Sequence, residues 1–136
     1  MRLKKDEFYA WEFENSSGQG KSAVVPAEIR GWNWGASLLG WIWAAGNKRY
    51  NIAAYGLAVY MLSFLLGPLG WAAELAISIM LGMKGNEWAW QSKKWKSVED
   101  FKTTQKKLLY WGIAAAAFDA LLMLWVGIEE FGMWHI

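Results

Sequence analysis

The chain has 136 residues with a formal net charge of +2, no cysteine and one histidine. The absence of cysteine excludes disulfides and thiolate metal sites, and a single histidine cannot build a histidine-ligated metal centre in a monomer. The small net charge gives no support for nucleic-acid binding.

Charged residues make up 19% of the chain and are unevenly distributed. Glu74 is the one charged residue between Ile52 and Met83, and Asp119 is the one between Leu108 and Ile128. A membrane-spanning helix needs about 20 mostly apolar residues. We therefore predict an all-α integral membrane protein, with a polar N-terminal segment (1–31) and a helical membrane domain (32–136).

Residues 1–31 carry five basic and five acidic residues and lack the apolar region of a cleavable signal. The aromatic run "FYAWEFE", the turn "SSGQG" and the following "KSAVV" are compatible with a β-hairpin over 8–25. Within this segment, "NSSGQGKS" (15–22) is similar to a phosphate-binding Walker A loop, with Asn15 in place of its first glycine. Because Val24, Val25 and Pro26 begin a helix poorly, we interpret these residues as a turn.

Residues 32–46 form a tryptophan-rich run about 22 Å long as a helix, which is shorter than the roughly 30 Å of bilayer hydrocarbon. Tryptophan favours the headgroup level, where its ring is half buried and its N–H stays wet. We expect a flat interfacial helix or a re-entrant one. Its expected membrane anchors are Trp32, Trp34, Trp41 and Trp43, followed by the basic pair Lys48 and Arg49. The alternative is a short fourth span, which would place the N-terminal segment outside.

The apolar stretch that follows is too long for one crossing and is interrupted by Gly67-Pro68, a turn signal. It is predicted to form a transmembrane hairpin with spans 50–67 and 69–85.

The basic segment 84–107 carries three further tryptophans, Trp88, Trp90 and Trp95. Lysine beside tryptophan is typical of a surface that binds anionic lipid headgroups, so we expect these indoles to be interface anchors. A role as base-stacking platforms for nucleic acid is the weaker interpretation, because spans flank the segment. Ser97 and Asp100 then predict the start of an amphipathic helix that continues into a third span, 108–128.

All 14 Lys and Arg residues lie in 1–31, 47–51 and 84–107. A hairpin over 50–85 places these three segments on one side of the membrane. The positive-inside rule makes that side the cytoplasm, with the N-terminus inside, the C-terminus outside and three crossings.

Glu74 and Asp119 are the strongest candidates for a functional site. Glu74 shares a helix stripe with Ser78, and both acids lie on stripes of small residues that let helices approach closely. The predicted packing positions are Gly70, Gly82, Gly112, Ala116 and Ala120. The acids could form a proton or cation pathway. The favoured interpretation is a protonated acid that fixes helix packing through a hydrogen bond.

A sequence pattern in the tryptophan-rich segment resembles a bacterial family of helical membrane proteins of unknown function. The pattern is aromatic-x-W-x-A-x-x-x-G-x-x-W, closed by a basic pair and an aromatic residue. It is matched by Trp32, Trp34, Ala36, Gly40, Trp43, Lys48, Arg49 and Tyr50. The chain departs from it at Gly35 and Trp41, where the family often has proline.

The later "GNEWAW…KKW…SVEDFK" is similar to small bacterial membrane proteins that sometimes carry the label ribonuclease G. The aqueous side of this chain lacks the carboxylate cluster that such an activity needs. The resemblance therefore implies a helical inner-membrane protein and no activity.

No nucleophile–base pair, metal-ligand set or phosphate loop indicates an enzyme. We expect a non-enzymatic structural or assembly component that self-associates or joins a larger membrane complex. It would need no cofactor and would contact anionic lipids but not nucleic acid. The proton or cation pathway through Glu74 and Asp119 is the alternative.

Overall fold

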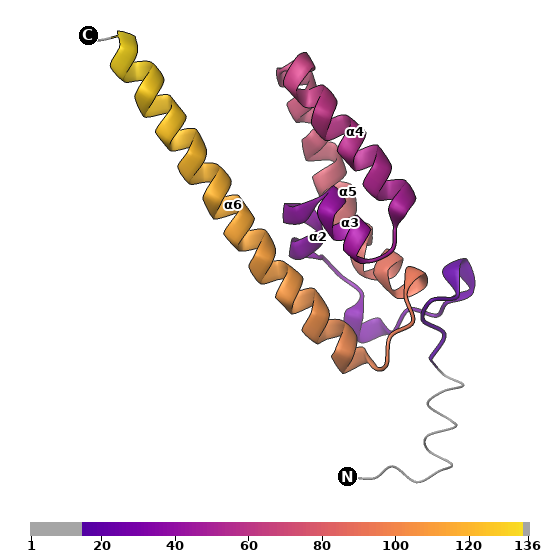
Figure 1. The fold of residues 1–136 in the computed structure, drawn as a ribbon. Coiled ribbons are helices and arrows are strands. Elements are labelled where there is room, and N and C mark those ends of the chain that lie inside the picture. Colours follow the sequence, from indigo (N-terminus) through magenta and orange to yellow (C-terminus); the bar gives the residue numbers. More distant parts are fainter. Residues whose placement is uncertain (1–14, 135–136) are drawn as a thin grey trace, which may run out of the picture.

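The computed structural model describes residues 15–134, which form helices and connecting turns without any strand in that range (Figure 1). The elements are η1 (Gly20–Ser22), η2 (Ala27–Ile29), α2 (Trp34–Leu39), α3 (Trp41–Gly46), α4 (Tyr50–Leu66), α5 (Pro68–Ser92) and α6 (Val98–Trp134). The predicted all-helical class is confirmed. Residues 8–14 of the predicted β-hairpin lie outside the described residues, and 15–25 form turns and η1 in place of a strand.

Helices α4 and α5 pack against each other, and the chain reverses direction between them at Gly67. Gly67 has φ 57° and ψ −127°, a conformation that side chains other than glycine disfavour. Pro68 occupies the first turn of α5, where its missing N–H costs nothing. At Gly70, a Cβ atom would collide with the backbone of Ser63, so this glycine permits the close approach of the two helices.

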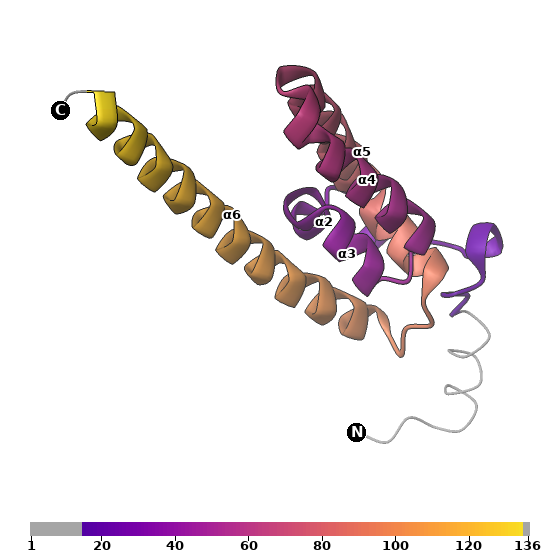
Figure 2. The same cartoon turned by 45° about the horizontal axis from the view of Figure 1, so that its top comes forward.

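The tryptophan-rich segment forms two short helices that reverse at Gly40, in place of one flat helix over 32–46. Gly40 has φ 59° and ψ −124°, nearly the conformation of Gly67. Helix α2 packs against α5 and α6, and α3 packs against α4, so this short hairpin lies between the other helices (Figures 1 and 2). A flat helix is excluded because the glycine reverses the chain after only six helical residues.

Helix α6 begins at Val98, directly after the predicted cap Ser97, and continues without a break to Trp134. The Asp100 N–H donates to Ser97 Oγ at 3.0 Å, and the Lys96 N–H donates to Asp100 Oδ2 at 3.3 Å. The first bond is the N-cap bond of a capping box, while the second reaches the N–H of Lys96, one residue before the cap, in place of the Ser97 N–H. The helix is about 55 Å long, more than a bilayer core requires.

Helix α5 extends to Ser92, and the segment predicted as a basic surface stretch instead supplies part of the hydrophobic core. Trp90 and Trp95 both pack edge-on against Phe101 of α6, with ring centroids 5.7 and 4.9 Å apart. We call the buried cluster at the end of the molecule where α6 begins the basal core. Its members are Val25, Ile29, Ala36, Trp43, Ala44, Ala53, Leu81, Ala89, Trp90, Trp95 and Phe101.

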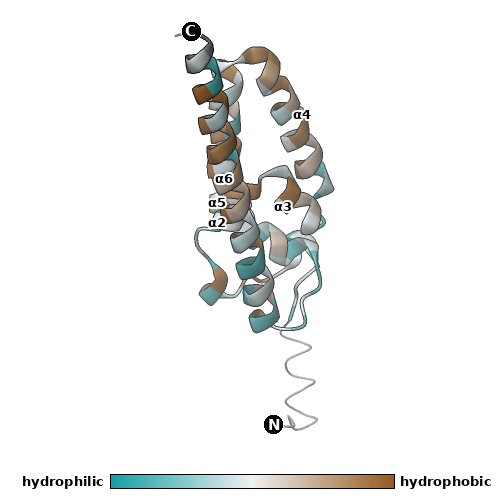
Figure 3. Ribbon diagram, turned by 60° about the vertical axis from the view of Figure 1, so that its left-hand side comes forward, coloured by the Kyte–Doolittle hydropathy of each residue, from teal (hydrophilic) through white to brown (hydrophobic). Residues whose placement is uncertain are grey.

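Beyond the basal core, α6 diverges from the α4–α5 pair, and both expose apolar side chains (Figures 1 and 2). We call residues 54–80 and 113–132 the apical arms. Hydrophilic residues gather at the basal end, while hydrophobic residues cover the arms (Figure 3). Among the described helices, α6 is long and apolar enough to cross a membrane, over Val98–Gly132. Only 6% of its most apolar 18-residue stretch is buried inside the protein. Helix α4 is apolar but shorter.

Candidate functional site

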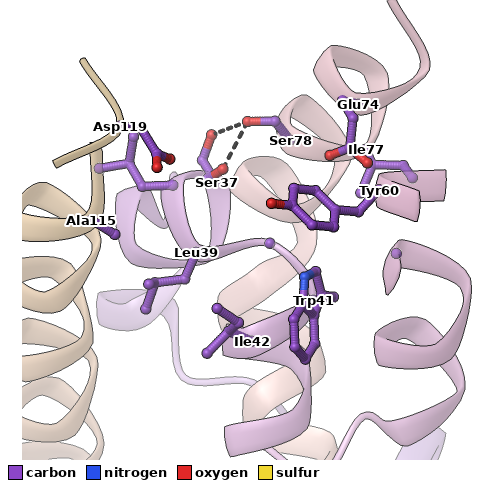
Figure 4. Close-up of a pocket in the computed structure, with 13 residues that line it drawn as sticks. Ser37, Leu39, Trp41, Ile42, Tyr60, Glu74, Ile77, Ser78, Ala115 and Asp119 are labelled. Atoms are coloured by element: carbon purple, nitrogen blue, oxygen red, sulfur yellow. Dashed lines mark hydrogen bonds between the residues drawn. The ribbon is translucent and has the colours of Figure 1, made fainter. Parts of the chain in front are cut away.

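A cavity of about 360 Å³ lies at the tip of the α2–α3 hairpin and brings the two predicted acids together (Figure 4). Glu74 and Ser78 reach it from α5, Asp119 from α6 and Tyr60 from α4. The hairpin tip contributes Ser37, Leu38, Leu39, Gly40, Trp41 and Ile42. The short hairpin therefore forms one wall of a cavity whose other walls are the apical arms.

A pair of serines joins the hairpin tip to α5 inside this cavity. Ser37 Oγ and Ser78 Oγ are 2.7 Å apart, and Ser78 Oγ also donates to the Ser37 carbonyl at 2.8 Å. Glu74 and Asp119 lie on opposite sides of this serine pair (Figure 4). The favoured prediction was that a protonated acid fixes helix packing through a hydrogen bond. Glu74 Oε1, however, is buried without a hydrogen-bond partner among the described residues. Both acids face the cavity, and their role stays a prediction.

Small residues allow the hairpin to sit close enough to α6 for Asp119 to share the cavity. A Cβ atom at Gly35 would lie 3.0 Å from the backbone nitrogen of Leu109. One at Gly112 would lie 3.0 Å from Leu38 Cβ. Glycine at both positions thus removes the side chain that would push α2 away from α6.

A buried network of amide side chains holds the base of the same hairpin. Gln105 Oε1 accepts hydrogen bonds from Asn33 Nδ2 and Trp43 Nε1, both at 2.9 Å, and Gln105 Nε2 donates to Asn47 Oδ1 at 3.0 Å. Asn33 Nδ2 also donates to Asn86 Oδ1 at 2.8 Å. The network therefore ties both ends of the hairpin to α5 and α6.

The amide network was not predicted from the sequence, although Asn33 left a detectable signal. Its Oδ1 accepts from the Ala36 N–H at 2.8 Å, which is the standard bond of a helix N-cap. Asparagine directly before a helical run indicates such a cap. No local pattern indicates that Gln105 is the partner of Asn33 across the fold, or that Asn47 bonds to Gln105.

The predicted interface anchors divide into exposed and buried residues. Trp43, Trp90 and Trp95 are no more than 1% exposed, so the expectation that they meet lipid headgroups is wrong for these three. The remaining predicted anchors, Trp32, Trp34, Trp41, Lys48, Arg49 and Trp88, are exposed or half-buried. Each buried indole donates its N–H to an acceptor inside the protein. Trp43 donates to Gln105 Oε1, Trp90 to the Val24 carbonyl and Trp95 to the Ala89 carbonyl.

The segment that resembles a Walker A loop packs against the end of α5 and the turn before α6. Asn15 Nδ2 donates to the Trp95 carbonyl at 2.8 Å, and the Trp95 N–H donates to Ser17 Oγ at 2.9 Å. The Gly18 N–H donates to the Trp90 carbonyl at 2.8 Å. These amide and hydroxyl groups are used within the protein, which agrees with the interpretation as a turn.

Arg49, one of the predicted anchors, is held by α5. Its Nη2 donates to Gln91 Oε1 at 2.8 Å, and its guanidinium lies 5.7 Å from the ring centroid of Trp88. Burial lowers the pKa of Arg49, and the nearby Glu87 carboxylate opposes this shift. The side chain therefore fixes the start of α4 to the basal part of α5.

The predicted packing positions also divide. Three of them make close approaches: Gly70 to Ser63, Gly82 to Trp32 and Gly112 to Leu38. Ala116 and Ala120 are exposed on α6.

Within the described part of the chain, no group of three or more His, Cys, Asp or Glu residues could hold a metal ion.

Comparisons with known proteins add no assignment to this geometry. No family model, no curated protein and no solved structure matches the chain.

Proposed function

We propose that the chain is a multi-pass protein of the bacterial inner membrane. In this arrangement α4, α5 and α6 cross the bilayer, α2 and α3 form a re-entrant hairpin, and the basal end lies in the cytoplasm with the N-terminus. The apolar surface of the arms supports this, because an exposed apolar surface of such extent is unfavourable in water. The basic residues support the orientation, since none follows Lys107.

Cysteine labelling tests this topology directly, because the natural chain contains no cysteine. A membrane-impermeant maleimide added to whole cells should label Leu69→Cys, beside the α4–α5 turn. It should label Lys94→Cys only after the membrane is opened. Labelling of Lys94→Cys in intact cells would contradict the topology.

Within the membrane, the protein acts as a non-enzymatic component that assembles with itself or with a larger complex. The observation that carries this proposal is the unpartnered small-residue face of α6, where Ala116 and Ala120 are exposed one helical turn apart. An apolar cavity of about 470 Å³, lined by residues that include Trp111, Ala114 and Phe118, adjoins the same helix. Small residues on an exposed transmembrane face favour close packing of a second helix.

Mass measurement in mild detergent tests assembly. We expect a multiple of the 15.5 kDa chain mass, reduced to the monomer by Ala116→Leu with Ala120→Leu. The control is Ala117→Leu, which adds the same bulk on a neighbouring face of α6. A wild-type protein that is monomeric in both detergent and lipid nanodiscs would exclude self-association.

A proton or cation pathway is the second candidate, and the cavity at the hairpin tip favours it. Glu74 and Asp119 come from different helices and face one space, with the Ser37–Ser78 pair between them. Intramembrane acids that face a cavity are typical of proton and cation pathways. We expect flux in proteoliposomes to be lost in Glu74→Gln and Asp119→Asn but retained in Glu129→Gln, near the end of α6. Absence of flux with the wild-type protein would exclude this candidate.

A further inference from the structure

A second cavity, of about 390 Å³, lies at the basal end between residues 28–35 and the first turns of α6. We call it the basal cavity. Its lining includes three basic side chains, Arg30, Lys102 and Lys106, together with Trp32, Trp34 and Leu109. Its volume falls in the range of roughly 300–1,000 Å³ that is usual for small-molecule sites.

The basal cavity has an excess of positive charge. Lys102 pairs with Glu28, which also lines the cavity, at 3.1 Å, and it lies 3.9 Å from Glu99. Arg30 donates its Nε to the Val25 carbonyl at 3.2 Å. Within 4.0 Å, no carboxylate among the described residues neutralises Arg30 or Lys106. These two cations remain available to an anion in the cavity.

The position of the basal cavity along α6 indicates what kind of anion it fits. Lys107 is the last Lys or Arg of the chain, and an apolar stretch begins at Leu108. The cavity spans this boundary, from Lys102 to Leu109. Its indoles, Trp32 and Trp34, are 40% and 58% exposed and lie edge to face with ring centroids 5.4 Å apart. Exposed indoles beside basic residues are typical of the headgroup level of a membrane.

We propose that the basal cavity binds the phosphate group of one anionic phospholipid, with Arg30 and Lys106 as its cationic ligands. The acyl chains follow Trp34 and Leu109 toward the apolar part of α6. This inference rests on the proposed membrane insertion and deepens it, because it assigns a single lipid site in place of a general surface affinity. A phospholipid has both the charge and the apolar chains that the two ends of the cavity require.

Native mass spectrometry of the full chain tests this site. The protein is released from micelles that contain equal amounts of phosphatidylglycerol and phosphatidylcholine. We expect one phosphatidylglycerol molecule to remain bound in preference to phosphatidylcholine. Arg30→Gln and Lys106→Gln should each reduce that preference about fivefold, the effect expected for one basic residue at a membrane surface. Arg30→Lys, which retains the charge, should keep most of the preference.

Lys107→Gln is the matched control, because it removes the same charge one residue farther along α6 and does not line the basal cavity. It should leave the phosphatidylglycerol preference unchanged. An equal loss in Lys107→Gln and Lys106→Gln would indicate a diffuse surface charge and overturn the proposal. Displacement of the lipid by millimolar inorganic phosphate would assign the site to a free anion and overturn it as well.

Alkaline extraction of membranes separates this inference from the proposed function. A wild-type protein that resists extraction but shows no phosphatidylglycerol preference overturns the lipid site alone. A wild-type protein that alkali extracts overturns membrane insertion and the lipid site together. Resistance to extraction combined with the preference and with the variant pattern above supports both.

Discussion

The basal core and the apical arms are both rich in aromatic and aliphatic side chains, but these side chains have different surroundings. Trp90 in the core is 1% exposed, whereas Trp125 in the arms is 60% exposed. The core indoles donate their N–H groups to internal acceptors, and the core also encloses the amide network around Gln105. The comparison indicates that the basal half is held by its own packing, while the arms need an apolar solvent or a partner.

The largest difference between the two regions is expected when one indole is removed from each. Trp90→Ala should lower the free energy of unfolding by about 3–5 kcal/mol, because it leaves a cavity in a packed core. Trp125→Ala should change it by less than about 0.5 kcal/mol, since the side chain packs against little of the chain. Equilibrium unfolding in detergent micelles measures both. Equal losses would show that the arms are packed as tightly as the core.

The amide network gives the next largest effect. Gln105→Ala leaves the buried Trp43 Nε1–H and Asn47 Oδ1 without a hydrogen-bond partner, which should cost about 2–3 kcal/mol of unfolding free energy. Thr103→Ala, at an exposed position two residues earlier on α6, should be nearly neutral and serves as the control. The same unfolding measurement applies. A neutral Gln105→Ala would mean that water enters the base of the hairpin and replaces the lost amide.

The difference between these regions also explains what could be predicted from the sequence. The reversal signal at Gly67-Pro68 and the helix start at Ser97 are local, and both elements begin where their residues indicate. Glu74 and Asp119 could be singled out together because each is the one charged residue of its predicted apolar stretch. The burial of Trp43, Trp90 and Trp95 could not be predicted, because an indole suits a membrane interface and a core equally well. For Trp43 and Trp90 the acceptors of the indole N–H are supplied by residues more than 60 positions away, Gln105 and Val24.

The α2–α3 reversal at Gly40 joins the two regions, and its disruption should have an intermediate effect. No atom lies within 4 Å of a Cβ built at Gly40, so Gly40→Ala tests backbone conformation alone. With φ 59°, alanine should cost about 1–2 kcal/mol of unfolding free energy. Gly46→Ala, also free of close neighbours, lies within α3 and should be neutral or stabilising by up to about 1 kcal/mol. If both variants behave alike, the reversal at Gly40 does not constrain the hairpin.

The smallest expected effect concerns the surface of the basal half. Glu28→Gln removes the ion pair with Lys102, in which both side chains are substantially exposed, and should lower the free energy of unfolding by less than about 1 kcal/mol. If the basal end lies in water, 1 M NaCl should abolish this difference, because the Debye length then falls to about 3 Å. Trp125→Ala changes no charge, so its effect on the free energy of unfolding should be the same with and without 1 M NaCl. A difference for Glu28→Gln that persists in high salt would place this pair away from water and weaken the contrast between a hydrated basal end and apolar arms.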